Sequence, residues 1–410
     1  MSTPRRHDLD WVRVCAFGVL VLYHVGMYYV TWDWHVNSPR ASHALEPLMM
    51  AAAPWRLSLL FLVSGAATAF LLARARADAD ARGGRPRFLG VRSWRLLLPL
   101  LFGMLVVVPP QSYLEVVEKL PGGYHDGYLA FWARYLSADD GFCRGGDCLV
   151  LPTWNHLWFV AYLWVYTVVL WALVRFAPGA LAVAGTRLAA LLRSPAGVLL
   201  WPALFFAAAR IALVGVFDST HALVDDWYNH VQYFAAFMLG FLVARRDAVW
   251  EAIGRSRRPA AALWLASWLA IALYFQAYAD VVPPEPLRLA MRVVWGLNQW
   301  SAIVAVLGFA YRLRPGDSPL LRHLSQAVFP VYILHQTIIV VLAHRLGPLD
   351  LPPLLEGPLL VVLTFGLCFA GVEVIRRIPP LRPLFGMRFR NRRPAAAAGA
   401  CVATPPPDAR

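Results

Sequence analysis

The sequence has few charged residues and few cysteines. Charged side chains make up 15% of its 410 residues and hydrophobic ones 59%, which leaves too little polar surface to cover a soluble fold. Five cysteines are too few for a disulfide scaffold. No zinc-ligand spacing accompanies them, so no metal site is expected. The scarcity of charge therefore predicts an integral membrane protein.

Internal repeats and an attached soluble catalytic domain are also lacking. The missing repeat disfavours transporter folds built from duplicated halves. Residues 1–390 are expected to form one membrane domain, followed at 391–410 by a low-complexity cytoplasmic tail that we expect to be disordered. Any chemistry must therefore take place inside a helical bundle or at its two faces.

Long apolar runs are what the sequence has in abundance. About ten of them approach the roughly 20 residues that cross a bilayer, and the first is interpreted as a retained helix, not a cleaved signal peptide. The sixth run is short unless Trp227 and Tyr228 belong to it. An all-α, polytopic bundle is therefore predicted. The runs begin near Trp11, Leu48, Trp94, His156, Val198, Gln232, Leu263, Val293, Val328 and Leu359.

The positive net charge of +14 is distributed unevenly along the chain. With ten spans, most arginines fall on alternate connections, and most acidic residues fall on the others. This pattern follows the positive-inside rule and places both termini in the cytoplasm. Contact with anionic lipid headgroups explains most of these arginines, so nucleic acid is not an expected partner. A multi-pass protein of a bacterial inner membrane is the predicted location.

The first apolar run contains three ionisable residues on one helix face. Asp10 and Arg13 lie one turn apart, and His24 follows Arg13 by eleven residues, about three turns or 16 Å along the axis. Ionisable groups inside a membrane are costly, and histidine can accept and return a proton near neutral pH. A catalytic role is one interpretation. A packed histidine beside an arginine that reaches the interface is the other.

The third run begins with the sequence GVRSWRLLLP, which places Arg92 and Arg95 one turn apart. A helix N-terminus offers free N–H groups, and guanidinium groups bind phosphate well. The pair therefore predicts an anion site on the cytoplasmic face. The alternative is that Arg92 and Arg95 only fix the orientation of this helix in the membrane.

Five further polar residues stand where apolar side chains would be expected. Asn155 and His156 open the fourth run and could be interfacial anchors. His335 lies in the middle of the ninth run, where a hydrogen bond between helices would also explain it. Ser64 could simply permit close helix packing. Arg210, deep in the fifth run, needs an anionic partner or ligand.

The longest outer connection, residues 110–153, is rich in aromatic and acidic residues and is expected to cover or line an outward-facing site. It contains Cys143 and Cys148 in the sequence FCRGGDC. These two cysteines form a small disulfide if this face is oxidising, and two free thiols are the alternative.

Several of these segments, taken in order, resemble the membrane acyltransferase 3 family. The similar segments are LDWVR followed by a histidine, as Arg-x10-His at Arg13 and His24; FLVSG; Arg-x-x-Arg at Arg92 and Arg95; NHLWFVAYL; FMLGFLVAR; and FPVYILHQT. They span about residues 8–375, nearly the whole chain.

The resemblance implies an enzyme that transfers an acyl group from cytoplasmic acyl-CoA to a hydroxyl of an extracytoplasmic carbohydrate, with no tightly bound cofactor. His24 would be the catalytic histidine, with Arg13 and Asp10 beside it. Arg92 and Arg95 would bind CoA phosphates, and Ser64, in FLVSG, is placed with them. Asn155, His156, His335 and Arg210 are predicted to bind or support the substrates.

Within the family the chain looks most like the branch that contains glucan biosynthesis protein C, which is associated with succinylation of periplasmic glucans. Many sugar O-acetylating members carry an acidic residue after LWF, whereas this chain reads AYLWVY, so both succinyl-CoA and acetyl-CoA remain candidate donors. A transient acyl-histidine, the oligomeric state and the acceptor are left open. The competing function is a secondary transporter or flippase of a small anion or lipid-linked glycan.

Overall fold

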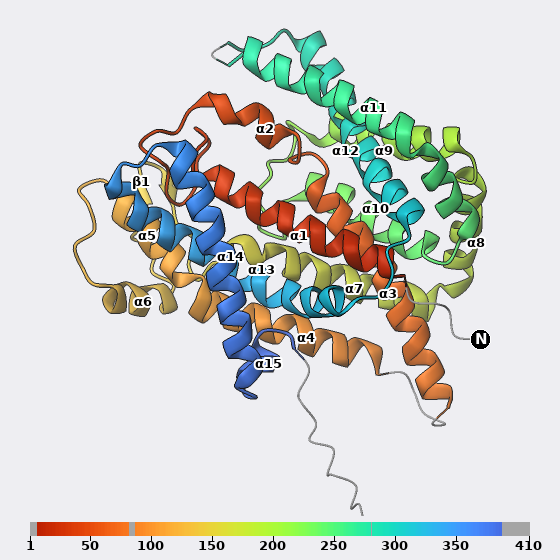
Figure 1. The fold of residues 1–410 in the computed structure, drawn as a ribbon, viewed down its shortest axis with the longest axis horizontal. Coiled ribbons are helices and arrows are strands. Elements are labelled where there is room, and N and C mark those ends of the chain that lie inside the picture. Colours follow the sequence, from red (N-terminus) through yellow and green to blue (C-terminus); the bar gives the residue numbers. More distant parts are fainter. Residues whose placement is uncertain (1–5, 82–86, 280, 388–410) are drawn as a thin grey trace, which may run out of the picture.

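The computed structural model describes residues 6–81, 87–279 and 281–387, and these form a bundle of helices (Figure 1). The predicted tail at 391–410 lies outside the described residues. The described helices are α1 (His7–Met27), α2 (Glu46–Met50), α3 (Arg56–Asp80), α4 (Phe88–Phe102), α5 (Pro109–Lys119), α6 (Tyr128–Leu136), α7 (Trp158–Phe176), α8 (Pro178–Leu191), α9 (Pro195–Leu213), α10 (Trp227–Val243), α11 (Asp247–Ala277), α12 (Glu285–Leu313), α13 (Pro319–Leu346), α14 (Pro353–Arg377) and α15 (Leu381–Leu384).

Shorter elements complete these helices. A π-helical segment, Gly103–Val107, joins α4 to α5 into one continuous span. The 3-10 turns His43–Leu45, Asn155–Leu157 and Gly347–Leu349 adjoin α2, α7 and α13. One antiparallel hairpin, β1 (Cys143–Arg144) and β2 (Asp147–Cys148), lies between α6 and α7. The predicted all-α class is therefore confirmed.

Nine spans within the described residues are long and apolar enough to cross a membrane. The tenth predicted span corresponds to α10, which has 17 residues and includes Trp227 and Tyr228. It is shorter than the nine others, which have 19 residues or more, and its first turns carry polar side chains. The nine spans are His7–Met27, Arg56–Ala79, Phe88–Lys119, Asn155–Phe176, Pro195–Leu213, Asp247–Ala277, Glu285–Leu313, Pro319–Leu349 and Pro353–Arg377.

Helix α10 packs against α3 at backbone distance. A Cβ atom on Gly65 of α3 would lie 1.9 Å from the carbonyl oxygen of Phe237, and one on Gly240 of α10 would lie 1.9 Å from that of Leu62. Small residues permit this approach, which is typical of helix pairs in membranes. The FLVSG and FMLGFLVAR segments therefore meet here, and the short α10 is held inside the bundle.

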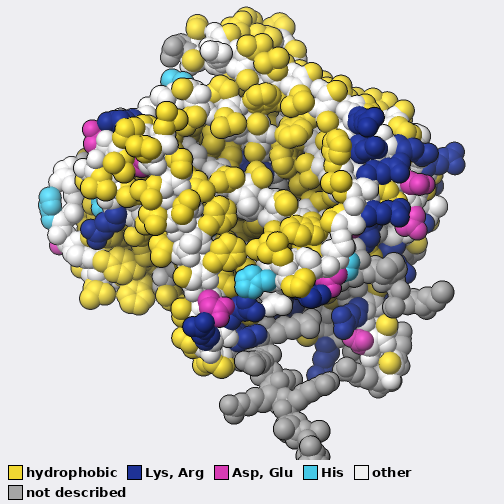
Figure 2. Space-filling model, in the orientation of Figure 1, with side chains coloured by type: hydrophobic (Ala, Val, Ile, Leu, Met, Phe, Trp, Pro, Cys, Tyr) yellow, Lys and Arg dark blue, Asp and Glu magenta, His cyan; other side chains and the backbone are white. Residues whose placement is uncertain are grey.

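The bundle has two ends, which we call the N-terminal face and the loop face. The N-terminal face contains the start of α1, the start of α4 and the segment after α14, because one cavity there is lined by Asp10, Arg92 and Arg382. The loop face contains α6 and the hairpin, at the opposite end of α1 in Figure 1. Figure 2 shows hydrophobic side chains across the middle and lysine and arginine side chains gathered along the right-hand edge and below.

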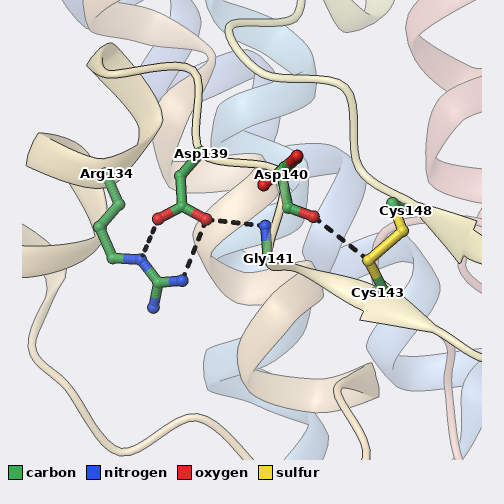
Figure 3. The surroundings of a disulfide bond; sticks show 6 residues. All are labelled: Arg134, Asp139, Asp140, Gly141, Cys143 and Cys148. Carbon is green, nitrogen blue, oxygen red and sulfur yellow. Dashed lines mark hydrogen bonds and ion pairs between the residues drawn. A yellow bond between two sulfur atoms is a disulfide. The ribbon is translucent and has the colours of Figure 1, made fainter.

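The segment between α5 and α7 forms a small folded unit on the loop face. Phe131, Tyr135 and Phe142 are almost fully buried in it. Beside them, Cys143 and Cys148 form a disulfide (Figure 3). Of the two alternatives left open for FCRGGDC, the structure contains the disulfide.

Candidate active site

An arginine-lined cavity of about 670 Å³ lies at the N-terminal face. We call it the arginine cavity. Its walls come from α1, α3, α4, α7, α13 and the segment around α15. Five residues singled out in the sequence line it together: Asp10, Arg13, Ser64, Arg92 and Arg95. Residues from three separate apolar runs therefore meet at one site.

Local helix geometry presents the charged groups to this cavity. Asp10 and Arg13 lie at i, i+3 on α1 and form an ion pair of 3.5 Å. Arg92 and Arg95 have the same spacing on α4, so their side chains share a face. An Arg95 guanidinium nitrogen donates to the carbonyl of Gly386 at 3.4 Å, which ties the C-terminal segment to α4.

Sequence reasoning missed two more arginines of the cavity, Arg322 at the start of α13 and Arg382 in α15. They are far from α4 in the sequence, so residue spacing alone could not show that they lie near Arg92 and Arg95. The buried Nε of Arg92 has no hydrogen-bond partner among the described residues. Asp10 and Asp317, which pairs with Arg322, are the carboxylates beside these five guanidinium groups. The remaining positive excess suits a ligand with several negative charges.

Aromatic side chains close the inner end of the arginine cavity. Phe17, Phe159 and Phe329 line it, and each packs against the ring of Tyr332, with centroid distances of 5.5, 6.1 and 6.2 Å. We call these four residues the aromatic wall. Tyr332 is 2% exposed and does not line the cavity itself, so its ring forms the layer behind the three phenylalanines.

Three histidines meet on the other side of Tyr332. The rings of His156 and His335 lie 5.6 and 5.8 Å from it. Nδ1 of His24 lies 2.8 Å from Nε2 of His335, with the two rings nearly parallel. His156 packs edge-on against His335 at 5.1 Å. This histidine cluster joins α1, α13 and the turn before α7, and it contains three of the predicted site residues.

The hydrogen bonds assign a tautomer to each partner in the His24–His335 pair. Nδ1 of His335 lies 2.6 Å from the carbonyl oxygen of Tyr332 and must donate to it. In neutral His335, Nε2 is then an acceptor, so His24 donates through Nδ1. The lone pair of neutral His24 is therefore on Nε2. The pair is arranged so that His24 can act as a base through that atom.

His156 has both ring nitrogens engaged. Nε2 lies 3.2 Å from the carbonyl of Ile333, and Gln111 lies 3.4 Å from Nδ1. The Tyr332 hydroxyl donates to the backbone carbonyl of His156. His156 therefore holds α7 against α13 and fixes the wall, while its ring faces His335.

A chain of polar side chains leads from this region to the loop face. Asn155 and Gln336 both donate to Oε1 of Gln111 at 3.1 Å. Gln336 also reaches Nε2 of His35 at 2.9 Å, and Nδ1 of His35 lies 2.6 Å from Glu115. Sequence reasoning identified Asn155 but missed Gln111, His35 and Glu115, since their partners lie far away in the sequence.

Arg56, at the start of α3, is a further buried cation that sequence reasoning missed. It is 9% exposed, and its guanidinium carbon lies 3.4 Å from the ring centroid of Tyr23, the residue before His24. One terminal nitrogen donates to Ala53 at 3.0 Å, while Nε has no partner among the described residues. It lies inside the apolar run that begins near Leu48, and an ionisable residue within such a run was a signal that could have selected it.

Arg210 does not join this site. It lies on α9, donates to the hydroxyl of Tyr228 at 3.0 Å and sits 4.2 Å over the ring of Trp295. A separate cavity beside it contains Arg288 and Arg292. Aromatic rings and a hydroxyl thus surround the guanidinium, and no carboxylate pairs with it in the described part of the chain.

No three His, Cys, Asp or Glu side chains come together as a candidate metal site within residues 6–81, 87–279 and 281–387.

Comparison with known proteins gives a match over nearly the whole chain. A family model described as an acyltransferase domain matches residues 6–373. Proteins named Glucans biosynthesis protein C from Salmonella heidelberg (strain SL476) and Salmonella schwarzengrund (strain CVM19633) are each 22% identical over 397 residues, which cover 94% of this chain and 95% of theirs. The protein of that name from Salmonella gallinarum is 22% identical over 396 residues. No solved structure matches.

Proposed function

The chain belongs to the acyltransferase 3 family, and from this premise we propose that it transfers an acyl group from cytoplasmic acyl-CoA to a hydroxyl of an extracytoplasmic glucan or other glycan. It is a multi-pass membrane acyltransferase. The name of its relatives supports a glucan as acceptor. Succinyl and acetyl groups are the proposed acyl groups, and a bacterial inner membrane is the proposed location.

One observation carries the proposal, namely that only the aromatic wall separates the arginine cavity from the histidine cluster, with Tyr332 packed between the three phenylalanines that line the cavity and the histidines. Phosphate groups of CoA have the charge and acceptor atoms that Arg13, Arg92 and Arg95 can bind. A thioester on the far end of such a ligand would then point at Tyr332. Displacement of the rings of the aromatic wall would bring the thioester to His24.

The chemistry follows from the tautomer of His24. Nε2 of His24 removes the proton of the acceptor hydroxyl, and the oxygen attacks the thioester carbonyl carbon. The carbon–sulfur bond breaks, and the CoA thiolate takes the proton back from Nε2. His335 keeps Nδ1 of His24 protonated throughout. The buried guanidinium of Arg56 is proposed to stabilise the negative oxygen of the tetrahedral intermediate.

The acceptor is proposed to enter from the loop face. Sugar hydroxyls both donate and accept hydrogen bonds, and the chain of Gln111, Gln336, His35 and Glu115 offers both kinds of group. The disulfide of Cys143 and Cys148 lies on this face. Disulfides persist in oxidising compartments, so the hairpin supports an extracytoplasmic loop face and a cytoplasmic N-terminal face.

The test compares the envelope glycans of a gene-deletion strain with those of complemented strains. Mass spectra should show an alkali-labile acyl ester that wild type and His344→Ala restore and His24→Ala does not. His344 is the matched control, because it lies at the loop-face end of α13 and bonds Glu118 at 2.7 Å, outside the histidine cluster. Full ester restoration by His24→Ala at equal membrane levels would refute the mechanism. Absence of any ester difference would refute the glycan acceptor.

A further inference from the structure

A second basic cavity adjoins the arginine cavity at the N-terminal face. It measures about 590 Å³ and is lined by Gln326, Glu373, Arg376, Arg377 and Arg382. We call it the C-terminal cavity. Gln326 and Arg382 line both cavities, so one ligand that lies across these two side chains can occupy both.

The arginines of the C-terminal cavity are held in place by their neighbours. Glu373, one turn earlier on α14, lies 3.2 Å from Arg377 and 3.8 Å from Arg376. His323 on α13 lies 2.9 Å from Arg376. Arg382 donates to the backbone carbonyl of Arg376 at 3.1 Å, which fixes α15 against the end of α14. Three guanidinium groups and one carboxylate leave a positive excess around the cavity.

The end of α14 alone explains part of this cluster. Arginines in the last turn of a helix interact favourably with its exposed carbonyl groups. That effect requires no cavity, however, and it does not explain why Arg382 from a different helix turns back onto the same place. Three guanidinium groups close together repel one another, and a bound dianion would relieve this repulsion. A phosphate monoester is such a ligand.

We propose that the C-terminal cavity binds the 3′-phosphate of the CoA nucleotide, while the arginine cavity binds the diphosphate. This inference rests on the proposed function and deepens it by specifying the donor. Acyl-CoA has two separate phosphate groups, a diphosphate and a ribose 3′-monoester, which correspond to two connected basic cavities. An acyl carrier protein presents its thioester on a phosphopantetheine arm without that monoester. The donor is therefore a free CoA thioester.

The experiment measures kcat and KM of the purified full-length protein with acyl-CoA and with acyl-3′-dephospho-CoA, which differ only in the monoester. Charge-assisted hydrogen bonds of a phosphate to arginine lead us to expect a KM about tenfold higher for the dephospho donor, at similar kcat. In Arg376→Gln/Arg377→Gln, the ratio of the two kcat/KM values should fall towards one. Arg187→Gln, on the exposed surface of α8, should keep the wild-type ratio.

The ratio is internal to each variant, so a partly misfolded preparation still gives an interpretable result. Equal kcat/KM for both donors in wild type would overturn the inference while leaving the proposed acyl-CoA donor intact. An unchanged ratio in the double variant would also overturn it, because the monoester would then bind elsewhere. Failure of the wild type to use either donor would overturn both the inference and the proposed function.

Discussion

Nδ1 of His335 donates to the carbonyl of Tyr332, so Nε2 is left to accept from His24. Replacement of His335 by leucine removes that acceptor and lets the ring of His24 turn or take the other tautomer. We expect His335→Leu to lower kcat about 10²-fold or more, with little change in KM, because the lone pair on Nε2 of His24 is then no longer held towards the substrate. Steady-state kinetics at matched protein levels measure the effect.

His335→Gln is the matched variant, because its side-chain carbonyl can still accept from Nδ1 of His24. It should retain clearly more activity than His335→Leu. Equal kcat in the two variants would show that the acceptor at this position has no catalytic effect and that His335 serves packing only.

Arg56 is the only arginine among the buried polar residues of the described part of the chain. Its position over Tyr23 puts a cation next to His24 along α1. If it stabilises the tetrahedral oxyanion, Arg56→Gln should lower kcat by about 10²-fold with little change in KM. Arg56→Lys keeps the charge and should recover part of that loss. An Arg56→Gln enzyme with unchanged kcat and raised KM would instead place Arg56 in ground-state binding.

At the scale of helices, the close contact between α3 and α10 can be tested with a substitution at Gly65. Gly65→Ala places a methyl group 1.9 Å from a backbone oxygen of α10, so one helix must shift. Overpacking of this kind costs about 1–3 kcal/mol, and we expect a lower thermal midpoint and less folded protein. Gly366→Ala on α14 is the control, because its Cβ meets nothing within 4 Å. Equal midpoints for the two variants would contradict the close α3–α10 contact.

The loop unit contains an ion pair with a predictable pH dependence. Hydrogen bonds from Arg134, at 2.7 and 3.1 Å, hold the pKa of Asp139 below its usual value (Figure 3). A lowered pKa in the folded state stabilises the loop above the unfolded pKa of about 4, and this contribution is lost as the pH falls through the folded pKa. Asp139 also accepts from the Gly141 amide at 2.7 Å.

Hydrogen exchange at that amide, corrected for its intrinsic pH dependence, should therefore keep its protection at about pH 5 and lose it progressively below the usual carboxyl range. Asp139→Asn should remove this pH dependence. Protection with the same pH dependence in wild type and Asp139→Asn would show that the ion pair does not hold the loop.

At the scale of the whole molecule, the sequence predicted most of the features that depend on periodicity and hydropathy. Residues that share one helix face, such as Arg13 with His24 or Arg92 with Arg95, could be placed from spacing alone. Contacts between helices could not. Nothing in the sequence pairs His24 with His335, or Arg92 with Arg382, because side-chain spacing carries no information about which helices become neighbours.

Arg210 illustrates the opposite limit. Its depth in an apolar run indicated an anionic partner or ligand, and its neighbours among the described residues are Tyr228 and Trp295. Aromatic faces and a hydroxyl group can surround a guanidinium in place of a carboxylate, so burial of a charge predicts a partner without specifying its chemical type.

The orientation of the bundle gives the last prediction. The indole of Trp154 donates to the carbonyl of His221 at 3.0 Å, so the connection between α9 and α10 lies on the loop face. Arg246 donates to Thr186 at 3.3 Å, which places α8 at the opposite end of the bundle with the start of α11. The labelling of one cysteine introduced in the α9–α10 connection and of another introduced on α8 therefore shows which side of the membrane each face occupies.

In a Cys15→Ser/Cys401→Ser background, Asp218→Cys should react with a membrane-impermeant maleimide in spheroplasts, and Arg187→Cys should react only after the membrane is permeabilised. The background removes the exposed free thiol of the described residues and the further cysteine that the sequence has at position 401. The proposed reaction requires this result, because the arginine cavity must face the cytoplasmic pool of acyl-CoA. The reverse labelling pattern would put Arg92 and Arg95 outside and the Cys143–Cys148 disulfide inside, where thiols are kept reduced. Such a protein could not take its acyl group from cytoplasmic acyl-CoA through this cavity.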